Sequence, residues 1–181
     1  MNLHTPRLTL RPLCMEDAPA LNSIANQPHI LKRMPDWQST LRDTEGLIRF
    51  LIPQYDLANR ETARVLFAVV LEGALIGVVG VGNKEEADNE IEIAYFIARE
   101  HEGKGYITEA ARAVARWAFD TLQLNHLICI VEPDNVPSQR IAEKCGFQKL
   151  ETRMILNSGE TEEKPFHYYR LYPYQIPASA T

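Results

Sequence analysis

The chain contains a series of short apolar segments typical of β-strands. Leu8, Leu10 and Pro12 alternate with polar neighbours, which predicts a half-buried strand. The runs Val65–Leu71 and Ala74–Val81 predict two strands joined at Glu72 and Gly73, a pair that suits a tight hairpin turn. Further apolar or β-branched runs predict strands at Glu90–Ala98, Leu124–Val131, Phe147–Ile155 and Lys164–Tyr172.

Apolar residues recur at helical spacing in four other segments, namely Glu16–Asn26, Asp43–Ala58, Ile107–Leu122 and Asn135–Cys145. Pro53 is expected to kink the second helix, and Gly146 follows the end of the fourth. Pro28 and Pro35 bracket a polar stretch that we expect to be an exposed loop. Loops or turns are also expected at Asn83–Asn89 and Asn157–Glu160.

The order of these elements predicts the α/β class. One central strand–helix–strand crossover stands among antiparallel hairpins, which indicates a mixed, mostly antiparallel sheet with helices on both faces. A chain of 181 residues suffices for one full core. We therefore expect one domain over residues 1–172, followed by a loose tail over residues 173–181.

Composition narrows the classes of partner. The formal net charge of −5 provides no general field for phosphate backbones or anionic lipid, which argues against nucleic acid and membrane surfaces. Uncharged runs are far shorter than the roughly 20 apolar residues of a membrane-spanning helix. The first residues show no leader pattern, so a cytoplasmic location is expected. Cys14, Cys129 and Cys145 show no ligand spacing, which predicts reduced thiols and no metal site.

Two glycines mark the start of the helix that follows the strand Glu90–Ala98. Gly103 and Gly105 let the backbone approach a ligand, Lys104 adds a positive charge, and the amides of the helix start attract anions such as a pyrophosphate. A plain flexible connection is the alternative. The P-loop pattern fails here, and a dinucleotide-binding fingerprint lacks its third glycine, at Thr108.

A second informative stretch begins after the strand Leu124–Val131. Asn135 can cap the helix that follows, and Ser138 lies in its first turn. Both helix starts are expected at the same edge of the sheet, where the ligands of open α/β sheets usually bind.

At this point the chain resembles the GCN5-related N-acetyltransferase superfamily, within it the branch that acetylates the N-termini of ribosomal proteins. The resemblance covers nearly the whole chain. It rests on four motifs in order: Thr5-Pro-Arg-Leu-Thr-Leu-Arg11, Glu92-Ile-Ala-Tyr-Phe-Ile97, Gly103-Lys-Gly-Tyr-Ile-Thr-Glu-Ala110, and Asn135-x-x-Ser138 leading to Lys144-Cys-Gly-Phe147.

The resemblance implies an enzyme that binds acetyl-CoA where two central parallel strands splay apart, with no metal. It implies that the backbone of Tyr95, Phe96 and Ile97 pairs with the pantetheine arm. The pyrophosphate would be wrapped by Gly103, Lys104, Gly105, Tyr106, Ile107 and Thr108. Asn135 would hold the pantetheine or the acceptor. Two residues depart from the family loop pattern, Glu102 and Ile107, and Glu102 is expected to point to solvent or pair with a cation.

The same resemblance suggests two catalytic residues. Glu92 matches an acidic position of the family and is our candidate for water-relayed proton removal, with Glu132 and Glu151 as competitors and an outward-facing strand carboxylate as the alternative. The tyrosine that many relatives use as the acid is replaced by Ala142. Ser138 is the candidate substitute, with a helix-capping hydroxyl as the alternative. Cys145 is expected to be a packed thiol.

The leading interpretation is an N-acetyltransferase that transfers acetyl from acetyl-CoA to a primary amine, such as a protein N-terminal α-amine. The alternatives are an acetyltransferase for a polyamine, amino sugar or antibiotic, and a catalytically silent acyl-CoA-binding module. The Met34–Leu41 loop and the last hairpin are expected to wall the acceptor site. The sequence names no acceptor and leaves the oligomeric state open, with a homodimer as one option.

Overall fold

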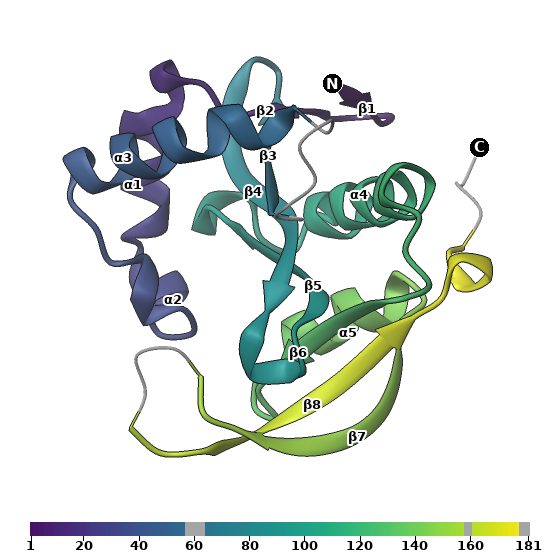
Figure 1. Cartoon of the computed structure of the whole chain (residues 1–181). Coiled ribbons are helices and arrows are strands. Elements are labelled where there is room, and N and C mark those ends of the chain that lie inside the picture. Colours follow the sequence, from purple (N-terminus) through teal and green to yellow (C-terminus); the bar gives the residue numbers. More distant parts are fainter. Residues whose placement is uncertain (57–63, 158–160, 178–181) are drawn as a thin grey trace.

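An eight-stranded sheet with the order β1-β2-β3-β4-β5-β6-β8-β7 forms the centre of the molecule in the computed structural model, which describes residues 1–56, 64–157 and 161–177 (Figure 1). The strands are β1 Leu3–His4, β2 Thr9–Pro12, β3 Val65–Leu71, β4 Ala74–Lys84, β5 Glu90–Ile97, β6 Leu127–Val131, β7 Gln148–Ile155 and β8 Lys164–Leu171. Among the described strands only β5 and β6 pair in parallel. The predicted mixed, mostly antiparallel α/β sheet is confirmed.

Helices cover both faces of this sheet, as predicted. They are α1 Ala18–Ala25, α2 Pro28–Leu31, α3 Leu41–Leu51, α4 Tyr106–Leu122 and α5 Val136–Lys144. In Figure 1, α1, α2 and α3 lie on one side of β3 to β5 and α4 lies on the other. The four longer helices correspond to the four predicted from helical spacing.

Strand β3 shows how one sequence pattern builds two cores. Phe67 and Val69 point to the face covered by α4, where the Phe67 and Trp117 rings meet edge to face at a centroid distance of 5.0 Å. Ala68 and Val70 point to the opposite face, which packs against α1 and α3. Successive side chains of a strand alternate between faces, so an uninterrupted apolar run feeds both cores.

The described residues before position 57 differ most from the sequence prediction. The segment between Pro28 and Pro35 is not simply an exposed loop, because Pro28–Leu31 forms α2 and Pro35–Trp37 forms a 3-10 turn. Proline at the first helical position favours such starts, and burial of Ile30 against α1 holds the segment in place. Strand β1, which pairs Leu3 with Leu10, was too short for a pattern to reveal.

Helix α3 begins earlier and ends sooner than predicted. Thr40 and Asp43 form a reciprocal capping box that starts the helix at Leu41. The helix ends at Leu51, and a 3-10 turn over Ile52–Tyr55 contains Pro53, which cannot continue an α-helix. Residues 57 and 58 of the predicted helix lie outside the described residues.

Later boundaries shift by a few residues. Strand β6 begins at Leu127 and not at Leu124, while β4 continues to Lys84. Residues 158–160 of the predicted hairpin turn lie outside the described part of the chain. The segment after β8 was expected to be loose, but it is structured as far as Pro177. Pro173–Gln175 forms a 3-10 turn. The carbonyl oxygen of Pro177 accepts a hydrogen bond of 3.2 Å from Arg116 on α4. Within the described ranges no helix is long and apolar enough to cross a membrane.

Candidate active site

The central parallel strands separate almost as soon as they meet. Strands β5 and β6 share one paired position, Glu92 with Ile128, and diverge beyond it. A cleft of about 630 Å³ opens along the separated part. Its walls come from β5, β6, α5 and the segment around α2. The predicted splay of the central strands is therefore present.

Seven of the twelve predicted site residues line this cleft. They are Glu92, Tyr95, Phe96, Ile97, Ile107, Asn135 and Ser138. The other five, Gly103, Lys104, Gly105, Tyr106 and Thr108, belong to the turn that begins α4, between the cleft-lining residues Glu102 and Ile107 or directly after them. The structure therefore brings together residues from three separate stretches of sequence.

The turn before α4 has the backbone that its glycines predict. Gly103 and Gly105 have φ angles of +73° and +80°, which residues with a Cβ atom rarely adopt. Among the described residues, the amide groups of Tyr106, Ile107 and Thr108 form no hydrogen bond. Free amides at the positive end of a 17-residue helix form a favourable environment for an anion.

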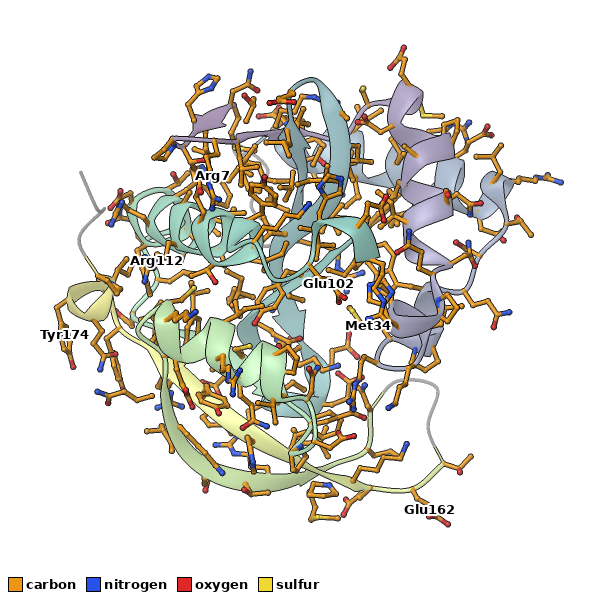
Figure 2. The ribbon with its side chains drawn as sticks, turned by 180° about the vertical axis from the view of Figure 1, so that it is seen from behind. Arg7, Met34, Glu102, Arg112, Glu162 and Tyr174 are labelled. Atoms are coloured by element: carbon orange, nitrogen blue, oxygen red, sulfur yellow. The ribbon has the colours of Figure 1, made fainter. Side chains whose placement is uncertain are left out.

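Arg7, whose part in the site was not predicted, braces this turn from outside. Its guanidinium donates a hydrogen bond of 3.0 Å to the Lys104 carbonyl oxygen and forms an ion pair of 2.7 Å with Glu109. It also lies 4.5 Å from the ring centroid of Tyr106. Figure 2 shows Arg7 beside α4. The Thr5-Pro-Arg stretch belongs to one of the motifs that carry the family resemblance. Its position beside the turn before α4 follows only from the folded structure.

The two departures from the family loop pattern are accommodated. Glu102 forms an ion pair of 2.9 Å with Arg99 and lies 3.5 Å from the His29 ring, so its carboxylate has a cationic partner, as expected. In Figure 2, Glu102, which precedes α4, and Met34, which follows α2, lie toward the same region. Both residues line the cleft. The side chain of Ile107 is buried and borders the cleft.

Glu92 lies at the root of the splay. Burial raises the pKa of its carboxyl to about 7, against the effect of the nearby Lys84 ammonium, which lowers it. The only hydrogen bond of its carboxylate among the described residues is a long one, 3.5 Å from the Ile130 amide. A carboxyl that titrates near neutral pH inside a cleft is suited to accept and release protons.

A second hollow of about 690 Å³ meets the cleft at Glu92. The two share Met34, Asp36, Lys84, Glu92 and Ala94. The predicted acceptor loop forms part of its wall through Trp37, Gln38 and Ser39. Its charged lining is mainly acidic, with Asp36, Asp43, Glu85, Glu86 and Glu92 against Arg64 and Lys84. This lining favours a cationic occupant.

Asn135 and Ser138 meet at the start of α5. The Asn135 side-chain oxygen accepts a hydrogen bond of 3.3 Å from the Ser138 amide, so Asn135 caps the helix while lining the cleft. The Ser138 hydroxyl lies 3.1 Å from the hydroxyl of Tyr95. Ser138 itself is therefore not the residue that caps this helix.

The competing candidates are less well placed. Glu132 lines the cleft but is held by Arg33, 2.5 Å away, which also lies 2.6 Å from Asp134. Glu151 lies on β7 and bonds to Arg153, and it lines neither hollow. Burial raises the pKa of Cys145 to about 12, which keeps it a packed thiol. Within residues 1–56, 64–157 and 161–177, no group of three or more potential metal ligands gathers.

Comparisons with known proteins agree with this geometry. A family model described as an acetyltransferase (GNAT) domain matches residues 7–148. The N-acetyltransferase p20 of Bacillus licheniformis is 32% identical over 149 residues, 81% of this chain and 82% of that protein. The ribosomal-protein-serine acetyltransferase of Escherichia coli is 25% identical over 117 residues, 65% of each chain. The solved structure of the microcin C7 self-immunity acetyltransferase MccE in complex with acetyl-CoA and AMP superposes with a TM-score of 0.78 at 18% identity, covering 93% of both chains.

Proposed function

Because this chain belongs to the acetyltransferase (GNAT) family and is an acetyl-CoA-dependent N-acetyltransferase, we propose that its acceptor is a primary amine that enters through the second hollow. The observation that carries this proposal is the junction at Glu92. There a cleft suited to a long, anionic thioester meets an acidic hollow suited to an ammonium group. The reacting groups would approach each other from opposite sides of one carboxyl.

The residues of the cleft fit acetyl-CoA, which supplies the activated acetyl group as a thioester. In our proposal, the amides from Gly103 to Thr108 hold the pyrophosphate, with Lys104 adding positive charge. The edge of β5 that β6 leaves unpaired, at Tyr95, Phe96 and Ile97, would offer main-chain groups to the pantetheine arm, although the Ile97 carbonyl oxygen already lies 3.0 Å from the His29 ring nitrogen. Asn135 lies at the opposite wall, where its side-chain amide can donate to the same arm.

Glu92 and Ser138 would carry out the proton transfers. An incoming ammonium must lose a proton before its nitrogen can attack, and a carboxyl with a pKa of about 7 accepts that proton, directly or through a water. As the new C–N bond forms, the C–S bond breaks and its electron pair leaves with sulfur. The Ser138 hydroxyl donates a hydrogen bond to that departing thiolate. The nitrogen loses a second proton as it becomes an amide, and the thiolate takes up a proton to give the CoA thiol, whose ordinary pKa is near 8.5.

We propose a protein N-terminal α-amine as the first acceptor to test. The E. coli relative is named for a ribosomal-protein substrate. An α-amine has a pKa near 8, so a modest base suffices, whereas a lysine side chain near 10.4 needs more help. A small cationic amine is the second candidate, and the acidic lining of the second hollow favours it equally.

The test measures release of the CoA thiol from acetyl-CoA with a panel of amines. It includes peptides with free N-termini, the same peptides blocked at the N-terminus but containing lysine, a polyamine and an amino sugar. We expect turnover with free N-terminal peptides and little with blocked ones. Turnover with the small amines alone would select the second candidate. Acetyl-CoA binding without turnover on any amine would reject the enzyme in favour of the silent binding module.

Replacement of Ser138 tests its part in the reaction. We expect Ser138→Ala to lower kcat by about tenfold to a hundredfold, the range of a lost proton donor, with the KM for acetyl-CoA within twofold of wild type. Ser23→Ala on the exposed side of α1 is the matched control and should leave both constants unchanged. An unchanged kcat in Ser138→Ala would remove the role.

The remaining assignments follow from the same proposal. We assign the catalytic domain to residues 1–172 and the terminal tail to residues 173–181. We propose the cytoplasm as the location, where the three thiols, all free in the structure, would stay reduced. A homodimer is the assembly to test first, by sedimentation of the purified protein.

A further inference from the structure

The side chain of Tyr95 connects the two walls of the cleft. It leaves β5, and its hydroxyl lies 3.1 Å from the Ser138 hydroxyl and 3.3 Å from the Ser138 carbonyl oxygen, both in the first turn of α5. Strands β5 and β6 pair only at Glu92, so this contact lies across the part of the sheet that has separated. The resemblance assigns the backbone of Tyr95 to the cofactor and says nothing about this hydroxyl.

We propose that the Tyr95 hydroxyl is a positioning group that orients the Ser138 hydroxyl toward the cleft. The inference rests on the proposed function, in which Ser138 donates to the departing thiolate. A serine in the first turn of a helix can rotate among three staggered positions and can turn its proton to a nearby backbone carbonyl. The Tyr95 hydroxyl has one proton and two acceptors, the Ser138 hydroxyl oxygen at 3.1 Å and the Ser138 carbonyl oxygen at 3.3 Å. In our proposal the nearer hydroxyl oxygen receives this proton, which removes the rotational freedom of the serine and leaves the serine proton for the cleft.

The surroundings of Tyr95 keep its hydroxyl protonated. Burial raises the pKa of its phenol well above the ordinary value, so the hydroxyl retains its proton at any pH at which the enzyme would work. The ring packs against the core that also holds α4 and α5, which limits its movement. A protonated, immobile hydroxyl beside Ser138 is what an orienting partner requires, since pre-organised groups lose less entropy when the reaction begins.

A four-member cycle tests the proposal: wild type, Tyr95→Phe, Ser138→Ala and the double variant. The measured quantity is the single-turnover rate of thiol release at saturating acetyl-CoA, together with the affinity for acetyl-CoA. We expect Tyr95→Phe to lower the rate by about threefold to tenfold, the range of one neutral hydrogen bond, with affinity within twofold. In the Ser138→Ala background the same change should lower the rate no further, because residues acting through one group are not additive.

Tyr55→Phe is the matched control. The Tyr55 hydroxyl is also held by the protein, because it accepts from the Leu13 amide at 3.0 Å and donates to the Leu66 carbonyl oxygen at 2.6 Å. It lines neither hollow. Its removal should lower the melting temperature and leave the single-turnover rate unchanged.

The outcomes distinguish the proposed function of the enzyme from the proposed role of Tyr95. A wild-type enzyme with no turnover on any amine overturns the proposed function, and the role of Tyr95 with it. Wild-type turnover with additive effects of Tyr95 and Ser138 overturns only the positioning role and makes Tyr95 an independent participant. An unchanged rate in Tyr95→Phe overturns the positioning role as well. Non-additive loss with unchanged affinity supports it.

Discussion

Glu92 is the residue at which the pairing of the central strands and the two hollows meet. It forms the single paired position of β5 with β6, and it lines both hollows. Burial raises its pKa to about 7, while Lys84 opposes that rise and Glu86 and Asp36 add to it. Two consequences follow at the scale of this one residue, one for the rate and one for stability.

The rate is expected to depend on the ionisation of Glu92. A base acts only when deprotonated, so kcat/KM should rise with pH through an apparent pKa near 7. Glu92→Gln should remove that rise and lower the rate by about a hundredfold, leaving only the later rise from the amine itself, near pH 8. The measurement is a pH–rate profile with two acceptors of different amine pKa. If the pH at which kcat/KM rises changes with the pKa of the acceptor amine, Glu92 is not the base. The same conclusion follows if the rise near pH 7 remains in Glu92→Gln.

The raised pKa of Glu92 should also lower the free energy of unfolding at neutral and alkaline pH. The ordinary pKa of a glutamate here is 4.5, so between pH 4.5 and 7 the folded protein keeps a proton that the unfolded chain has lost. The free energy of unfolding should therefore fall as pH rises through this window and change no further from this source above it. Glu92→Gln removes the buried charge and should be more stable than wild type by about 1–3 kcal/mol at pH 8.

Chemical denaturation at pH 4.5 and pH 8 measures this difference. The two proteins should be nearly equal at pH 4.5, where the wild-type carboxyl is already neutral. Glu151→Gln is the control, since its exposed carboxylate lies on β7 away from both hollows and should show no such gain. A Glu92→Gln variant less stable than wild type at pH 8 would show that the carboxylate is held favourably.

At the scale of the element, the turn that begins α4 is the most specialised feature. Two residues with positive φ bring three unpaired amides to the end of the cleft, and Arg7 holds the turn from behind through Lys104 and Glu109. The sequence predicted this turn because glycine is the residue that adopts such angles without strain. It did not predict Arg7, because nothing in a spacing of about a hundred residues indicates contact.

Gly105→Asp should weaken acetyl-CoA binding by well over tenfold, because it places a carboxylate and a side chain where we propose that the pyrophosphate binds. Gly73→Asp is the matched control: Gly73 has a φ of +85° in the β3–β4 hairpin, with nothing within 4 Å of an added Cβ atom. Both variants carry similar backbone strain, but only Gly105 belongs to the proposed pyrophosphate site. Calorimetric titration with acetyl-CoA distinguishes them, and equal affinities would refute the pyrophosphate assignment.

At the scale of the whole molecule, the cleft lies between two parts of the sheet, and side-chain contacts join these parts around it. One pair of residues joins β5 to β6, and the Arg33 guanidinium links the segment after α2 to Glu132 and Asp134 before α5. The Tyr95 hydroxyl contacts Ser138 on α5, and Glu90 on β5 accepts hydrogen bonds from Tyr168 and Arg170 on β8. A ligand in the cleft would contact both parts at once and should stabilise the molecule as a unit.

We expect acetyl-CoA at one hundred times its Kd to raise the melting temperature by about 5–10 °C. This follows from about 2.7 kcal/mol of linkage for a ligand that binds only the folded state, and about 2–4 °C per kcal/mol for a domain of this size. Thermal unfolding monitored with increasing acetyl-CoA measures the rise, and Gly105→Asp should require a much higher concentration. No rise at any concentration would contradict binding in the cleft.

The sequence by itself determined the class of the fold, the four longer helices and the turn before α4. Each of these is specified locally: alternation and helical spacing select strands and helices, while glycine and proline select turns. Family motifs pointed in advance to Glu92 and Ser138, although not to their surroundings.

Only the tertiary structure decided the surroundings of those residues. The raised pKa of Glu92 comes from burial, and burial depends on every element packed around it. The contacts of Arg7 with Lys104, Arg33 with Glu132 and Tyr95 with Ser138 join residues 43 to 99 positions apart. Pattern in a sequence reports only neighbours along the chain, whereas a site is made by side chains that packing brings together, so its chemistry appears when the chain is folded.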